Sequence, residues 1–329
     1  MKRVFVVAVA VLGLAACGNT GKPSAPPAAP SNAGPTAPLD GPADRRHWVP
    51  DVSAPVGLLV DGNLLWAAAS SADKILAVDP ATGKVVATVA VGDAPLRLAG
   101  GGGAVWASNF RDGTVSRVDP AAHTVTATYP VGPEPEGLAW AAGALWVIGQ
   151  KDGVLRKVDP ATGRVAASVP VGPEPRLVTA GKTALWVSGY GADALVPVDP
   201  ATAKAGAAIP VCDGPQGAVE VDGVVWVACT NAGKVAAVDA QTRKVVATLD
   251  TSPYPDGVTA AGGRVFVVGQ QGPTVIAIDA AKRTVAATHP AGQGSGLADQ
   301  GNDDIAVVGG EVWLSRFDSG DLVSMPTFE

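Results

Sequence analysis

A unit of forty residues recurs along most of this chain, and the repeat limits the possible folds more than any other feature. Five tryptophans mark it at 40-residue spacing, and the series continues through Phe266 and Trp313; the five are Trp66, Trp106, Trp146, Trp186 and Trp226. An aspartate series beginning at Asp79 and a proline series beginning at Pro55 share the same register. Three series in one register indicate a repeat architecture.

Each repeat is predicted to form four short antiparallel strands. Between residues 95 and 131, runs rich in valine and alanine at 96–100, 104–109, 114–118 and 124–131 are separated by turns that contain Gly, Asp or Pro. Gly83 and Gly163 close the last turn in sibling repeats, where a positive φ is expected. Four-stranded units of about 40 residues are typical of propeller blades.

The seven aromatic positions predict an all-β fold, a seven-bladed propeller of four-stranded antiparallel blades over residues 44–329. Abundant glycine (41) and proline (28) with only 16% charged residues suit such a turn-rich chain. The last repeat ends without a fourth strand, whereas residues 45–49 precede the first repeat in the register of an outer strand. We therefore expect residues 45–49 to complete the last blade and remove an exposed edge.

Residues 1–17 are predicted to be a lipoprotein signal peptide. A basic start and an apolar run at 4–14, too short to span a bilayer, precede Leu-Ala-Ala-Cys, which matches the bacterial lipobox. The match implies acylation of Cys17, including palmitate, and cleavage before it; an ordinary signal peptide is the alternative. Several acyl chains would anchor the protein durably outside the cell membrane. Residues 18–43, rich in Pro and Ala, are expected to form a disordered tether.

The repeats resemble the YVTN family of bacterial β-propellers. The resemblance rests on residues 132–139 (GPEPEGLA), 144–147 (ALWV) and 158–165 (VDPATGRV), and it covers about residues 50–329. This chain has Trp where that family usually has Tyr. The resemblance implies a propeller fold and no particular activity, because most members lack an assigned one.

Two cysteines remain besides Cys17, and they fit a disulfide. Cys212 precedes the inner strand of the fifth blade, and Cys229 ends the next strand. The start of one antiparallel strand and the end of its neighbour meet at one edge, so a bridge is sterically plausible. An oxidising compartment favours it; the alternative is two free thiols.

The turns that enter the inner strands and those that join the second to the third strands should share one face, around the mouth of the central channel. Residues there differ between blades, as a ligand site requires. The residue after the turn proline, for example Glu136, Arg176 or Asp256, differs from blade to blade, and Ser295 is taken as its equivalent in the last blade. The alternative is a solvated surface with incidental ion pairs, such as Glu136 with Arg176. The candidate ligand-binding residues are Arg97, Phe110, Arg111, Glu136, Arg176, Tyr190, Gln216, Tyr254, Asp256 and Arg316.

A second cluster is expected at the other end of the inner strands. Trp140, Glu220 and Asp299 are assigned to equivalent positions of three blades, where the two carboxylates would bind a cation or face water. The repeated aspartates are instead interpreted as turn-capping residues and the repeated tryptophans as core.

Composition and motifs exclude several functions. The net charge of −6 gives no footprint for nucleic acid. No metal cluster, phosphate loop or nucleophile elbow is found, and no cofactor is expected. The streptogramin B lyases are similar in blade pattern and depend on a central histidine and glutamate. Here His47, His123 and His289 all fall outside the inner strands.

The leading hypothesis is therefore a non-catalytic binding module, lipid-anchored to the bacterial cell membrane. It would engage a protein, peptide or small molecule through its mouth. The alternatives are a propeller enzyme, either lyase-like or a metal-dependent lactonase or hydrolase, and a structural component of the envelope.

Overall fold

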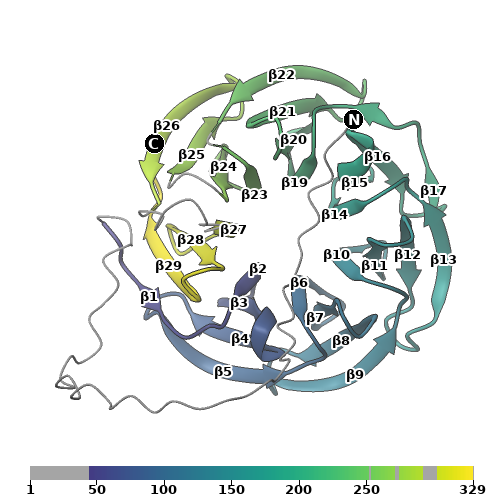
Figure 1. Ribbon diagram of the computed structural model, residues 1–329, viewed down its shortest axis with the longest axis vertical. Coiled ribbons are helices and arrows are strands. Elements are labelled where there is room, and N and C mark those ends of the chain that lie inside the picture. Colours follow the sequence, from purple (N-terminus) through teal and green to yellow (C-terminus); the bar gives the residue numbers. More distant parts are fainter. Residues whose placement is uncertain (1–43, 252, 271–273, 292–301, 329) are drawn as a thin grey trace, which may run out of the picture. The chain divides into compact units, whose positions relative to one another are not determined.

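A computed structural model describes residues 44–251, 253–270, 274–291 and 302–328. These residues form seven antiparallel sheets arranged radially around a central axis (Figure 1). The result confirms the predicted all-β, seven-bladed propeller. The predicted signal peptide with Cys17, the tether 18–43, Ser295 and Asp299 lie outside the described residues.

Strands within each blade follow one another from the axis outward, as Figure 1 shows. Blade 1 contains β2 (Pro55–Asp61), β3 (Leu64–Ala69), β4 (Lys74–Asp79) and β5 (Lys84–Ala90), with the 3-10 turn η1 (Ser70–Ala72) after β3. Blade 2 contains β6 (Pro95–Gly101), β7 (Ala104–Asn109), β8 (Thr114–Asp119) and β9 (Thr124–Pro130). Blade 3 contains β10 (Pro135–Ala141), β11 (Ala144–Gly149), β12 (Val154–Val158) and β13 (Val165–Pro170).

The remaining blades keep this order. Blade 4 contains β14 (Pro175–Ala180), β15 (Leu185–Gly189), η2 (Tyr190–Ala192), β16 (Ala194–Asp199), β17 (Lys204–Ala205) and β18 (Ile209–Pro210). Blade 5 contains β19 (Pro215–Val221), β20 (Val224–Cys229), β21 (Lys234–Asp239) and β22 (Lys244–Asp250). Blade 6 contains β23 (Pro255–Ala261), β24 (Arg264–Gly269), β25 (Thr274–Asp279) and β26 (Thr284–Pro290). Blade 7 contains β27 (Asn302–Val308), β28 (Glu311–Arg316), β29 (Asp321–Pro326) and β1 (Trp48–Val49).

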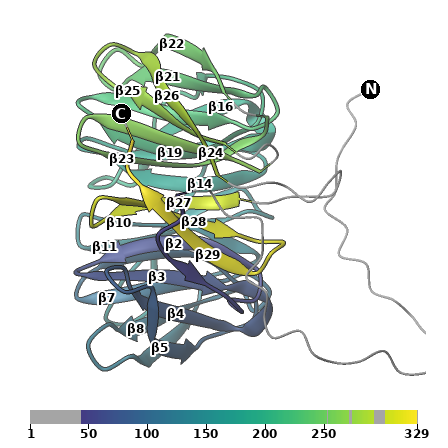
Figure 2. The same ribbon diagram turned by 90° about the vertical axis from the view of Figure 1, so that its left-hand side faces the viewer.

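Blade 7 closes the ring with a strand from the other end of the chain, as expected. β1 pairs antiparallel with β29, placing Trp48 opposite Val323. The observed strand is shorter than the predicted 45–49, although backbone hydrogen bonds from Arg46 and to His47 continue the pairing beside Ser324. Figure 1 shows β1 at the outer side of β29, and Figure 2 shows the same ring from its side. The edge of β29 is thereby covered.

The repeated aromatic residues form the core, as the spacing predicted. Trp66, Trp106 and Trp313 are completely buried, and Phe266 is only 2% exposed. Each ring packs between adjacent blades; Trp66 of blade 1, for example, shares an apolar cluster with Leu98 of blade 2. One blade cannot bury both faces of its own sheet, so stacking around the ring completes the core.

The repeated aspartates cap the turns between the third and fourth strands. In blade 2, Asp119 Oδ1 accepts hydrogen bonds from the amides of Ala121 and Ala122 at 2.8 and 3.0 Å. These bonds favour the ionised carboxylate and lower its pKa below 3.8. Gly83 ends the corresponding turn of blade 1 with a φ of 66°, in the predicted left-handed region. The prediction that this series is structural is confirmed for the turns.

Blade 4 departs from the repeat in its outer strand, which is split into β17 and β18. The cause lies in β16, where Pro197 has no backbone N–H to donate to an outer neighbour. Its carbonyl still accepts a hydrogen bond of 2.7 Å from Gly206, and pairing resumes at Ile209 opposite Leu195.

Blade 7 corrects the predicted register of the last repeat. Strand β27 places Ala306 opposite Trp313, just as β6 places Ala99 opposite Trp106. Asp303 therefore holds the position assigned to Ser295, and Val307 holds the one assigned to Asp299. The extra residues of this repeat precede its inner strand, so the equivalence assigned to Ser295 and Asp299 was wrong.

Candidate functional site

Entry turns fix where the inner strands begin. The residue before the first proline of these strands adopts a positive φ, 49° at Glu134 and 53° at Tyr254. A following proline disfavours the right-handed helical region at these positions. The carbonyl of Tyr254 then accepts a 2.9 Å hydrogen bond from Gln270, which follows the second strand of the blade. Entry turns and the turns between second and third strands thus lie on one face, called the mouth face below.

Arg97 lies at the centre of this mouth. It projects from β6 of blade 2 and is only 8% exposed. Its Nη1 lies 3.4 Å from Asp304 Oδ2 of blade 7, and its Nη2 lies 3.9 Å from Asp256 Oδ1 of blade 6. Gly57 of the intervening blade leaves room for this path, because a Cβ there would lie 2.9 Å from the Arg97 Cα and 3.4 Å from its Cδ.

Asp304 links the last blade to the first. Its Oδ2 accepts a 2.9 Å hydrogen bond from the backbone N–H of Leu58 on β2, and its Oδ1 accepts one of the same length from Ile305. Behind it, Ser315 Oγ donates to the carbonyl of Val56 at 2.6 Å. The carboxylate is thus held where it faces Arg97.

A second ion pair lies beside the first. Arg176 Nη1 of β14 is 3.6 Å from Glu136 Oε2 of β10. The side-chain amide of Gln150 is assigned with its oxygen toward Arg176. This oxygen accepts hydrogen bonds of 2.7 and 3.2 Å from Nη1 and Nε of Arg176. The guanidinium also lies 5.0 Å from the ring centroid of Tyr190, within cation–π range. Glu136, Gln150 and Tyr190 therefore hold Arg176 at the mouth from three different segments of the chain.

Asp256 is the most deeply buried acid of the group, at 1% exposure. Gln270 Nε2 donates to its Oδ2 at 2.7 Å, and Gln216 of blade 5 also hydrogen-bonds this carboxylate. Its Oδ1 is buried and has no hydrogen-bond partner among the described residues. Glu136 is 5% exposed, and its Oε2 is likewise buried without a hydrogen-bond partner among the described residues.

Burial raises the pKa of Glu136, Asp256 and Asp304 above the ordinary carboxyl values. Loss of hydration disfavours the charged form, and the guanidinium of Arg97 partly opposes that effect at all three. Asp256 in turn raises the pKa of both other acids. Side chains from blades 2, 3, 4, 6 and 7 thus converge on one electrostatic cluster, called the channel cluster below.

A cavity of about 130 Å³ lies at this end of the channel. Arg97 and Asp304 contribute its charged wall, while Gly137, Gly217 and Leu177 contribute backbone and apolar surface. This space holds a few water molecules or the end of one long side chain. A volume of this size suits recognition of a small group rather than enclosure of a large ligand.

The structure brings together five of the candidate residues, namely Arg97, Glu136, Arg176, Gln216 and Asp256. Tyr190 joins them through Arg176. Phe110 and Arg111 lie on the rim of blade 2, where Arg111 pairs with Asp93 at 3.3 Å. Tyr254 is 42% exposed at the entry of blade 6. Arg316 instead forms an ion pair of 2.6 Å with Asp321 inside blade 7, where the Trp48 indole also bonds Asp321.

Sequence reasoning missed Asp304. Arg97 lies nine residues before Trp106, and Asp304 lies nine residues before Trp313. Counting back from the tryptophan would therefore have found Asp304.

The opposite end of the inner strands carries no comparable cluster in the described structure. Glu220 Oε2 accepts hydrogen bonds from the Trp186 indole at 2.9 Å and from the Lys182 amide at 3.1 Å. Trp140 stacks against Trp106 with ring centroids 6.4 Å apart. Glu220 therefore joins two blades, and Asp299 lies outside the described residues. Within those residues, no group of three or more His, Cys, Asp or Glu is arranged to hold a metal ion.

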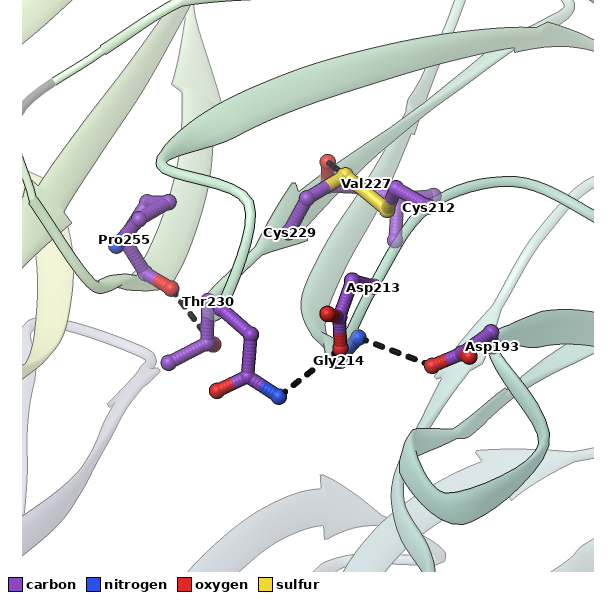
Figure 3. Close-up of a disulfide and its surroundings, with 9 residues drawn as sticks. Asp193, Cys212, Asp213, Gly214, Val227, Cys229, Thr230 and Pro255 are labelled. Atoms are coloured by element: carbon purple, nitrogen blue, oxygen red, sulfur yellow. Dashed lines mark hydrogen bonds between the residues drawn. A yellow bond between two sulfur atoms is a disulfide. The ribbon is translucent and has the colours of Figure 1, made fainter. Parts of the chain in front are cut away.

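The predicted disulfide is confirmed and joins the entry turn of blade 5 to the end of β20 (Figure 3). Cys212 and Cys229 are bonded, with Cα atoms 5.7 Å apart. The adjoining turn is tied to both neighbouring blades: Gly214 donates to Asp193 at 3.2 Å, and Thr230 donates to the Pro255 carbonyl at 2.7 Å. The cross-link therefore fixes one sector of the mouth.

A family model described as outer membrane protein assembly factor BamB (PQQ_2) matches residues 151–326. The chain belongs to this family. The BamB-family match covers blades 4 to 7 and part of blade 3. The narrower resemblance to YVTN propellers stays a prediction from the repeat. No curated protein matches the chain.

Solved structures with a similar fold cover most of this BamB-family chain. Hydrazine synthase from Kuenenia stuttgartiensis is 16% identical, covers 84% of this chain and 96% of its own, and has a TM-score of 0.72. A catalytically inactive histidine-to-alanine variant of virginiamycin B lyase from Staphylococcus aureus, with quinupristin, is 13% identical, covers 86% and 98%, and has a TM-score of 0.73. A streptogramin B lyase is 16% identical, covers 84% and 94%, and scores 0.70. At these identities, the likeness shows the fold alone.

Among the described residues, no helix is both long and apolar enough to cross a membrane.

Proposed function

We propose that this chain is a non-catalytic binding module that engages a protein or peptide through its mouth face. The channel cluster carries the proposal. In a fold whose core and outer turns repeat, the residues at the inner-strand starts vary: Leu96, Glu136 and Arg176 hold equivalent positions in blades 2, 3 and 4. Buried charges of this kind seldom stabilise a fold, so their presence at a cavity favours recognition.

The family description supports a protein partner. It names an outer membrane protein assembly factor, which is a protein that acts with other proteins. Exposed Tyr254 and the aromatic ring of Tyr190 give the mouth the side chains that recur at protein contacts. The disulfide supports an oxidising compartment.

A propeller lyase is the second candidate, because lyases of the streptogramin B type share the fold. One such enzyme is inactive when a histidine is replaced by alanine. Here His123 lies in an outer turn, and His289 lies on the outermost strand of blade 6. His47 adjoins the outermost strand of blade 7 and stacks on Trp313. No histidine of the chain lies at the channel, so the binding role is favoured.

Site-specific photo-crosslinking in intact cells tests the mouth assignment. A photoreactive phenylalanine replaces Tyr254 or Glu134 on the mouth face, and exposed Val86 on the outer strand β5 serves as the control. We expect a protein adduct from the mouth positions and none from Val86. Adducts from Val86 alone, or hydrolysis or opening of added quinupristin by the purified protein, would overturn the proposal.

The proposed location is the outer side of the cell membrane, through a lipid on Cys17. We expect the wild-type protein to partition into the detergent phase of Triton X-114 extracts, and Cys17→Ser to move it to the aqueous phase. Multiple acyl chains bind durably, whereas a single chain binds only marginally. Cys212→Ser is the matched control and should stay in the detergent phase. Aqueous wild-type protein would contradict the anchor.

A further inference from the structure

Charge is divided unequally between the two faces of the propeller. On the mouth face, the entry turns of blades 1 to 5 each carry an acid: Asp51, Asp93, Glu134, Glu174 and Asp213. The turns between the second and third strands of blades 1 to 4 add Asp73, Asp112, Asp152 and Asp193. The bases on these same turns are Arg111 and Lys151, which pair with Asp93 at 3.3 Å and Glu134 at 3.5 Å. The mouth face is therefore strongly acidic.

The opposite face is balanced. Most of its Asp-headed turns carry a compensating base a few residues on; Lys84, Arg164 and Lys204 follow Asp79, Asp159 and Asp199. The net acidity of the chain is thus concentrated at one end of the channel. Charge of one sign around a concave site raises the local concentration of oppositely charged ligands.

Some mouth acids have structural roles, which do not remove their charge. Asp73 accepts a 3.0 Å hydrogen bond from the amide of Ala94, and Asp193 holds Gly214. Glu174 and Asp51, by contrast, are exposed side chains on entry turns. The acids are spread from blade to blade around the rim, which suits an extended polycation better than a single metal ion.

The channel cluster gives an independent reason to expect a cation. Two guanidinium groups, Arg97 and Arg176, face three carboxylates there. Glu136 Oε2 and Asp256 Oδ1 are buried acceptors without a hydrogen bond, and the nearest guanidinium nitrogens recorded lie at 3.6 and 3.9 Å. Asp256 Oδ1 faces Nη2 of Arg97, whose side chain lines the channel cavity, and Glu136 Oε2 faces Nη1 of Arg176. A buried acceptor that lacks a donor favours any ligand that brings one.

We propose that the mouth face docks a lysine- and arginine-rich segment of a partner protein, one cationic side chain of which enters the channel and is bound by Glu136 and Asp256. The inference rests on the proposed function and names the chemistry of its partner. Lysine and arginine side chains are long enough to reach in from the rim, and their N–H groups are the donors that Glu136 Oε2 and Asp256 Oδ1 lack. Tyr254 adds an exposed ring on which a guanidinium can stack.

Fluorescence anisotropy with defined peptides tests the inference. The probes are a fluorescent (Lys-Arg-Gly-Ser)₃ peptide and its (Glu-Asp-Gly-Ser)₃ counterpart, both in EDTA. We expect only the basic peptide to bind, and its affinity to fall roughly tenfold between 50 and 300 mM NaCl because salt screens exposed charges. Equal binding of the acidic peptide, or spermine that competes as tightly as the peptide, would overturn the assignment.

Matched variants locate the contact. Asp51→Asn with Glu174→Gln removes two mouth charges and should weaken the basic peptide about fivefold, mainly through slower association. Asp61→Asn with Asp222→Asn removes the same charge from the opposite face and should leave affinity unchanged. Glu136→Gln should weaken binding about tenfold while its unfolding midpoint confirms a folded protein. An unchanged affinity in Glu136→Gln would remove the channel from the proposal.

The outcome separates this inference from the proposed function. Mouth-specific crosslinks without binding of basic peptides would retain a binding module and reject a basic partner. Loss of the mouth-specific crosslinks would reject both.

Discussion

Replacing Arg97 with methionine is expected to lower the free energy of unfolding at pH 7.5 by about 4 kcal/mol. Methionine keeps much of the apolar stem but removes the guanidinium that faces Asp256 and Asp304 at 3.9 and 3.4 Å. The two buried carboxylates then lose the guanidinium that they share, and this loss costs far more folding stability than breaking an exposed ion pair. A loss of this size should lower the midpoint of thermal unfolding by about 10 °C.

The effect of this substitution should depend on pH in a defined direction. The carboxyl pKa values of Asp256 and Asp304 are already raised by burial, and Arg97 is the largest influence that lowers them. Without Arg97 they rise further. A raised pKa contributes stability below the ordinary value of 3.8, and that contribution is lost as pH rises through the folded-state value. The deficit of Arg97→Met should therefore be full at pH 7.5 and smaller at pH 5.

Chemical denaturation followed by tryptophan fluorescence measures both effects, because the tryptophans at the blade interfaces are buried. Arg111→Met is the control: its ion pair with Asp93 is exposed, with the Arg side chain 58% accessible, and its loss should cost at most about 1 kcal/mol. A deficit of Arg97→Met that is the same at pH 5 and 7.5 would assign the loss to packing and contradict the electrostatic explanation.

Gly137→Ala is the second substitution with a large expected effect, about 3 kcal/mol of lost stability. A Cβ at Gly137 would lie 2.7 Å from the Arg176 carbonyl oxygen, 2.7 Å from the Leu177 Cα and 2.9 Å from the Val178 nitrogen. All three are backbone atoms of the next blade, so no side chain can rotate away. The blades must separate, and the channel cavity that Gly137 lines should change with them.

Gly100→Ala is the matched control on an equivalent inner strand. The Cβ added there meets only side-chain atoms, the nearest being Asp61 Oδ1 at 3.0 Å. Loss of backbone freedom in the unfolded chain offsets part of the crowding, and the change should stay within about 1 kcal/mol. The two variants are compared by denaturant midpoints. Equally small losses of stability in both variants would show that position 137 tolerates a side chain, and they would contradict the prediction.

Several parts of the fold could be predicted from local pattern alone. The hairpin around Asp119 was predicted because the carboxylate of an aspartate at the start of a tight turn can accept hydrogen bonds from the backbone amides of that turn. The strand at Ala104–Asn109 was predicted with the observed bounds, since Gly-rich and Asp-Gly turns flank it. These features depend on residues close in the sequence.

The last blade could not be predicted so well. Its added residues broke the 40-residue spacing, and only the pairing of β27 with β28 shows that they precede the inner strand. Asp304 was missed for that reason, and Asp299 was given a position that Val307 occupies. A register is fixed by two strands together, so one strand's sequence leaves it open when an insertion lies nearby.

The sequence by itself determined the number of blades, the core and the capped turns, because each repeat carries its own strands and its own large ring. Only the tertiary structure decided which mouth residues meet. Arg97 reaches acids from blades 6 and 7, whereas Arg316, predicted beside it, turns to Asp321 within its own blade. Closing the ring sets distances across the channel, and no local spacing in the chain encodes the distance between blades on opposite sides of an axis.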